Sequence, residues 1–284
     1  MKLISKLFLS LMLILGLTSC EKDGSTPLEN SNLLTKLEIQ KIGIQHNEAL
    51  NYVLDGLKKT NISNFKSTRK MEKFLNEELG KYYKTIIKND ASLKNVIQLS
   101  NKEVSKYLEL SNKSSYSKDE NKSPIELVIS ENEQHLSSSQ VDFLLQVDEA
   151  LKSFDGGNVT SILNTFETIQ NLAQSQLTET EAQVILISVE VGKMSVAYWN
   201  EHIEEWNQAL NQSQGNKFSN RSWFSWSGVA GADVAGAVGA AVTVAIVNVA
   251  PGAGQVAYGT AVVSTAAGAS VGQAVSQVWN HIFN

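Results

Sequence analysis

Residues 228–241 read GVAGADVAGAVGAA, a run in which every side chain except that of Asp233 is valine or smaller. Glycine and alanine recur at spacings of three and four residues, which aligns small side chains in rows along a helix. Such rows let two helix backbones approach closely. Residues 248–254 (NVAPGAG) carry the proline and glycines of a tight turn. The segment therefore predicts a helical hairpin with arms at roughly 230–249 and 255–281.

The hairpin supplies nine candidate site residues. At about 1.5 Å per residue its first arm would be close to the thickness of a bilayer's hydrocarbon core. Tryptophans flank both arms at the same end, where an interfacial aromatic belt would lie. The candidate helix-packing positions are Gly228, Gly231, Gly236, Gly239, Gly268 and Gly272, and the candidate membrane-interface residues are Trp223, Trp226 and Trp279.

The environment of the hairpin stays open at this stage. Glycine, alanine, serine and threonine contribute little transfer energy, so the arms are only marginally hydrophobic beside a leucine-rich span. Insertion into a membrane is one reading of the pattern. Packing into the rest of the fold, or against a second copy of the chain, is the other.

The chain begins MKLISKLFLSLMLILGLTSC, which has two lysines, an apolar run and small residues before Cys20. This pattern predicts a lipoprotein signal peptide at residues 1–19, with Cys20 lipidated. The apolar run is about half the roughly 20 residues that a membrane span needs. Cys20 is the only cysteine, so its lipidation leaves no thiol for a disulfide or a metal. If the cell has two membranes, Glu21 favours the outer one.

The remaining chain reads as helical, with three prolines in 284 residues and apolar spacings of three and four almost throughout. We predict an all-α protein with a bundle of about six helices plus the C-terminal Gly/Ala-rich hairpin. Caps are expected at Ser137, Asn158 and Thr178, and a central helix is expected around residues 184–199. The predicted parts are a tether at 20–32, a helical domain at 33–212 with a polar insert at 111–136, a linker at 213–222 and the hairpin at 223–284.

Neither the net charge nor the positions of the histidines indicate nucleic-acid binding, a metal site or catalysis. The formal net charge is −5, which argues against nucleic acid as a partner, since phosphate contacts need clustered lysine and arginine. The four histidines are dispersed, and His46 is expected to be a structural histidine with satisfied hydrogen bonds. His202 and Glu205 share a helix face, which is more typical of a solvated surface than of a metal site. We predict no enzyme activity, no catalytic residue, no cofactor and no metal.

The C-terminal segment resembles known sequences. The run Trp223-Phe-Ser-Trp226, then residues 231–239 (GADVAGAVG), then a Pro-Gly turn with Gly-Ala repeats, resembles the glycine-zipper tail of Bacteroidetes-type lipoproteins. It is also similar to the pore-forming helices of class II bacteriocins. The resemblance covers about 60 residues and implies close helix packing in or near a membrane.

These patterns predict an exported, lipid-anchored protein whose hairpin associates with or inserts into membranes in a bacteriocin-like manner. The alternative is a surface or periplasmic scaffold or binding protein, in which the hairpin packs within the fold or drives self-association. The expected partners are the membrane, through the Cys20 lipid and the hairpin, and further copies of the chain.

Overall fold

The computed structural model describes residues 33–60, 65, 67–87, 122–211, 224–247 and 254–283. These residues form α-helices and one short 3₁₀ helix, without any strand, so the all-α prediction is confirmed. Six helices precede the hairpin within this part of the chain, as expected. The six α-helices are α2 (Lys36–Lys58), α3 (Thr68–Ile87), α5 (Pro124–Glu131), α6 (Ser138–Ser153), α7 (Val159–Gln176) and α8 (Glu179–Asn211). The 3₁₀ helix η2 (Glu133–His135) lies between α5 and α6, and the hairpin consists of α9 (Trp226–Val247) and α10 (Gly254–Phe283).

Polar side chains cap the helix starts where the sequence predicts them. Ser137 and Gln140 form a reciprocal capping box at α6. The Asn158 side chain accepts from the Ser161 N–H at the start of α7. Thr178 and Glu181 exchange hydrogen bonds at α8. Each cap satisfies backbone N–H groups that have no partner inside their helix.

The predicted polar insert at 111–136 is corrected in its second half. Residues 124–131 form α5, which starts with Pro124 behind a capping box of Ser123 and Glu126. Proline suits this first position because its missing N–H would have no helical partner there. Ile125 and Val128 are fully buried, so the second half of the predicted polar insert contains a short amphipathic helix of about two turns.

Several sequence expectations lie outside the described residues. They are the signal peptide, Cys20 and the tether, the first part of the insert, the linker 213–222, Trp223 and the turn 248–253.

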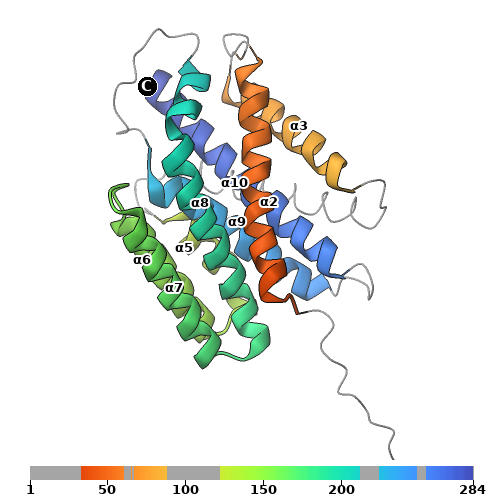
Figure 1. The fold of residues 1–284 in the computed structure, drawn as a ribbon, viewed down its shortest axis with the longest axis vertical. Coiled ribbons are helices and arrows are strands. Elements are labelled where there is room, and N and C mark those ends of the chain that lie inside the picture. Colours follow the sequence, from red (N-terminus) through yellow and green to blue (C-terminus); the bar gives the residue numbers. More distant parts are fainter. Residues whose placement is uncertain are drawn as a thin grey trace, which may run out of the picture. The chain divides into compact units, whose positions relative to one another are not determined.

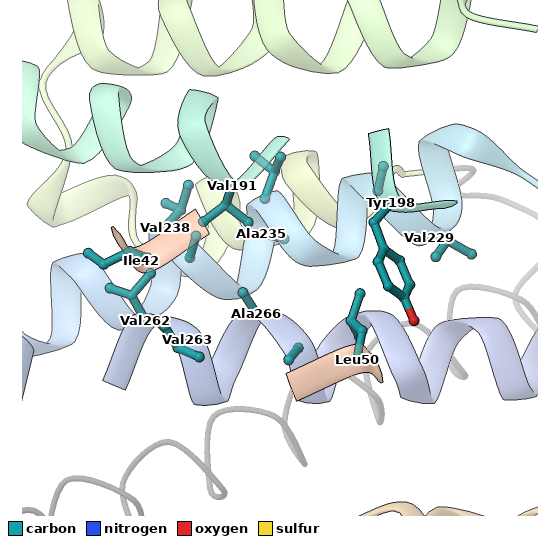
Figure 2. Packing of buried hydrophobic residues seen from close by; sticks show 14 of the residues in the cluster. Ile42, Leu50, Val191, Tyr198, Val229, Ala235, Val238, Val262, Val263 and Ala266 are labelled. Atoms are coloured by element: carbon teal, nitrogen blue, oxygen red, sulfur yellow. The ribbon is translucent and has the colours of Figure 1, made fainter. Parts of the chain in front are cut away.

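The hairpin forms the inner layer of the bundle. α9 contacts α10 along its length and also touches α5, α6 and α8, while α10 contacts α2 and α3. Figure 1 shows α9 and α10 behind the long helices α2 and α8. Figure 2 shows buried side chains on both helices of the hairpin, with Ala235 and Val238 on α9 and Val262 and Ala266 on α10. The described side chains of α9 from residue 229 to 242 are buried on every face, so this helix has no solvent-exposed side there.

α8 is the second central helix, as its sequence predicts. It contacts α2, α6, α7 and α9, and its side chains Val189, Val191 and Trp199 have no exposed surface. Although the composition changes sharply at 213–222, residues Leu33–Asn284 form one compact unit. The apolar hairpin and the amphipathic helices thus share a single hydrophobic core.

Candidate functional site

A buried polar cluster joins three helices at the centre of the bundle. Asp233 of α9 is 0% exposed. Its Oδ1 lies 2.8 Å from Nε2 of His46 on α2. Its Oδ2 accepts a hydrogen bond of 2.5 Å from the Ser195 hydroxyl and a longer one of 3.4 Å from the Trp199 indole, both on α8. The carboxylate of the hairpin is therefore held by both of the long helices that cover it.

The hydrogen bonds define the charge state of His46. Its Nδ1 lies 2.9 Å from Oδ1 of Asn47. The amide nitrogen of Asn47 donates to the Met194 carbonyl oxygen, which turns the amide oxygen toward the imidazole. Both ring nitrogens thus face acceptors, and only the imidazolium has a proton for each of them. His46 and Asp233 form a buried ion pair.

The pKa of His46 follows from two opposing effects. Complete burial lowers this pKa, because a charge is poorly solvated inside the protein. The negative charge of Asp233 and the hydrogen bonds to Asp233 and Asn47 raise it, and the result is a pKa above the usual 6.5.

This shift predicts a pH dependence of stability. A raised pKa in the folded state means that the folded chain binds the proton more tightly than the unfolded chain. The stabilisation is therefore complete below pH 6.5 and is lost as the pH rises through the folded-state pKa of His46. We expect the urea midpoint to fall over that range. A chain carrying both His46→Leu and Asp233→Leu should lack this component, and an unchanged pH profile in that double variant would contradict the assignment.

The geometry of the cluster suits holding helices together. The Ser195 hydroxyl donates to Asp233 and is not paired with His46, unlike the order in a Ser-His-Asp catalytic triad. Asp233, His46 and Ser195 have no exposed surface, so a substrate in solution has no access to them. A buried carboxylate with three donors, one of which is the charged His46, instead fixes the position of α9 against α2 and α8.

The predicted packing glycines differ in how close their neighbours lie. A Cβ added at Gly236 would lie 2.7 Å from the Thr265 carbonyl oxygen and 2.8 Å from Cα of Ala266, so α9 and α10 touch there through their backbones. At Gly231 the nearest atoms belong to Pro124 at 3.8 Å, which leaves room for a methyl group. Gly228 faces the Gln277 side chain. The other three, Gly239, Gly268 and Gly272, are buried.

The predicted interface tryptophans are placed in part. Trp226 is only 8% exposed. Its ring packs edge-on against Phe154 at 4.7 Å and Phe224 at 5.0 Å between centroids. Trp226 thus contributes to the protein core at the start of α9. Trp223 lies outside the described residues, and so does the side chain of Trp279.

His202 and Glu205 form a hydrogen bond of 2.9 Å on the surface of α8, and Glu205 also pairs with Lys58. Among the described side chains, no three of the histidine, cysteine, aspartate and glutamate type gather as metal ligands would. None of the described helices combines the length and the apolar composition needed to cross a membrane.

Sequence reasoning missed the pairing of His46 with Asp233. It did expect a satisfied structural histidine, but it left the partner unnamed. The available signal was that Asp233 is the only residue of the aspartate, glutamate, lysine and arginine types beyond Arg221. A single charge in an otherwise apolar, buried segment needs a partner of opposite charge.

Two depressions open on the described surface. One, of about 270 Å³, lies where the start of α2 meets α7 and α8, and the other, of about 470 Å³, lies beside Phe154 and Trp226. No known protein family, curated protein or solved structure shows significant similarity to the chain.

Proposed function

We propose that the protein is an exported, lipid-anchored helical bundle that acts as a scaffold or binding protein at a membrane surface, with the hairpin as its structural core. One observation carries the proposal. Asp233 is the only residue of the aspartate, glutamate, lysine and arginine types in the hairpin, and inside the bundle it pairs with His46 of α2. A hairpin built primarily for lipid would not need a partner from α2.

The packing around α9 supports the same conclusion. Val234 contacts the α8 backbone at Gly192, where an added Cβ would meet its Cγ2 at 3.1 Å. Gly236 meets the backbone of α10 in the same way. A protein interior is packed as densely as an organic crystal, so α9 can make such close contacts on two sides only if the neighbouring helices have complementary surfaces. Small residues of α9 therefore support close packing against other helices of the same chain.

The predicted lipid at Cys20 supports location at a membrane. The predicted signal peptide would direct export of the chain. Residues 21–32 would link the lipidated cysteine to the first described helix. A single lipidated cysteine followed by a stable bundle is an arrangement suited to presenting a binding surface close to a bilayer. Self-association would then use the outer helices, since the side chains of α9 from residue 229 to 242 are already buried within the bundle.

Direct association of the hairpin with lipid is a second candidate. It is favoured by the near absence of charge in α9 and α10. On this hypothesis the bundle would open, the ion pair between His46 and Asp233 would break, and α2 and α8 would move away from α9.

Liposomes distinguish the two candidates. The chain 21–284, which omits Cys20, is mixed with vesicles of phosphatidylethanolamine and phosphatidylglycerol that contain a trapped dye. We expect no dye release, and we expect the amide protons of residues 229–242 to exchange as slowly with vesicles as without them, because the bundle stays closed. Dye release together with faster exchange in α2, α8 and α9 would reject the scaffold proposal in favour of insertion.

A further inference from the structure

The first described helix carries apolar side chains outside its buried face. The buried side of α2 includes Ile39, Ile42 and His46. Leu37 is nevertheless 74% exposed and Ile44 is 49% exposed. They are seven residues apart, so they share one side of the helix across two turns, with Lys41 between them. We call Leu37, Lys41 and Ile44 the α2 outer stripe.

The stripe lies where the tether joins the bundle. The Leu34 N–H donates to Oε1 of Gln183 on α8 over 2.8 Å, and this bond is buried. Thr35 then caps α2, with its side chain accepting from the Glu38 N–H. These contacts fix the point at which the chain enters the fold, one helix turn from Leu37. The red end of α2 in Figure 1 marks this point.

The length of the tether limits how far this end can lie from Cys20. Residues 21–32 span at most about 40 Å when fully extended. The beginning of α2 is therefore the described part of the bundle with the shortest chain connection to Cys20.

The charges beside the stripe suit a lipid surface. Lys36 and Lys41 are exposed next to Leu37, while the Glu38 carboxylate accepts hydrogen bonds from the Thr35 N–H and hydroxyl. Lysine beside exposed aliphatic side chains is the composition by which helices lie on anionic bilayers. The carboxylate of Glu38 is turned toward the helix start and does not separate the two lysines from the stripe.

We propose that the α2 outer stripe docks the bundle on the lipid bilayer that holds the Cys20 anchor. This inference rests on the proposed lipid anchoring. Leu37 and Ile44 enter the headgroup region, and Lys36 and Lys41 contact phosphate groups. The docking fixes the orientation of the bundle, with the outer side of the start of α2 against the bilayer.

Environment-sensitive labels test this orientation. Leu37→Cys is made in the full lipidated chain, where lipidation blocks the thiol of Cys20, and is labelled with a nitrobenzoxadiazole fluorophore. The matched controls are Leu145→Cys on α6 and Leu172→Cys on α7, which are 41% and 40% exposed. In phosphatidylethanolamine and phosphatidylglycerol vesicles we expect a blue shift, and quenching by nitroxide lipids, only for the label at position 37. Equal spectra at the three positions would overturn the proposal.

Binding without the anchor provides the second readout. For the chain 21–284, Leu37→Ser with Ile44→Ser should weaken partition into the same vesicles about tenfold. Leu145→Ser with Leu172→Ser should leave it unchanged. A concentration-dependent dimer that only the first pair abolishes would instead assign the stripe to a second copy and overturn membrane docking.

The two proposals fail in different ways. Mass spectrometry of the exported protein shows whether Cys20 carries lipid, and an unmodified cysteine would reject the anchoring on which the function rests. The vesicle partition of the chain 21–284 does not depend on that lipid. Loss of anchoring and loss of docking are therefore separate results.

Discussion

Replacement of Asp233 by leucine is expected to destabilise the bundle by about 3–5 kcal/mol. The reason is the partner that remains. His46 has no exposed surface, and without the carboxylate it must either keep an unpaired buried charge or give up its proton and one hydrogen bond. Since domains are stable by only about 5–15 kcal/mol, this change would remove a large share of the total. Urea unfolding followed by circular dichroism measures the loss.

A double-mutant cycle separates the ion pair from simple loss of contacts. His46→Leu alone should be costly for the same reason, because it leaves Asp233 buried with only the Ser195 and Trp199 donors. The double replacement should recover much of the loss, since apolar side chains of similar volume can substitute for a buried pair. Ser195→Ala serves as a control and should cost about 1 kcal/mol. Additive losses from His46→Leu and Asp233→Leu would refute the pairing.

Replacement of glycine by alanine in α9 should affect stability differently at two nearby positions. Gly236→Ala would place its methyl group 2.7 Å from the Thr265 carbonyl oxygen, which is a backbone atom of α10. One of the two helices must shift, and we expect a loss of about 1–3 kcal/mol. The hairpin is the innermost layer of the bundle, so this shift would also disturb the contacts of α9 with α8.

Gly231→Ala is the matched control on the same helix. The added Cβ would lie 3.8 Å from Cδ of Pro124, which is an ordinary contact distance. Alanine is the better helix former by about 0.5–1 kcal/mol, so this variant should be unchanged or slightly more stable. Thermal unfolding of the two variants in parallel tests the expectation. Equal losses at both positions would show that small size along α9 matters generally and that Gly236 has no special contact.

Local sequence patterns were sufficient for most of the described helices. The capping boxes at Ser137 and Thr178 and the apolar spacing of α2 involve residues three or four apart, and such neighbours meet in any helix whatever surrounds it. α5 was missed because its eight residues are too few to show a clear period inside a polar stretch. The hairpin was predicted for the same local reason, since small residues at regular spacing and a Pro-Gly turn are features of adjacent sequence.

The candidate site required the tertiary structure. His46 and Asp233 are 187 residues apart along the chain, and nothing in either local pattern indicates the other. The burial of Trp226 between Phe154 and Phe224 is of the same kind, because helices α6 and α9 meet only in the folded bundle. The six glycines likewise share one pattern, and only their neighbours distinguish Gly236 from Gly231.

The sequence by itself determined that the chain is helical, where most of its helices begin and that its last segment forms a smooth hairpin. The tertiary structure decided what that hairpin touches. A row of small side chains specifies close approach but does not specify whether the approaching surface is lipid, another copy or the same chain. That choice depends on the sum of distant contacts, and here α2 and α8 provide the charge and the shape that α9 requires.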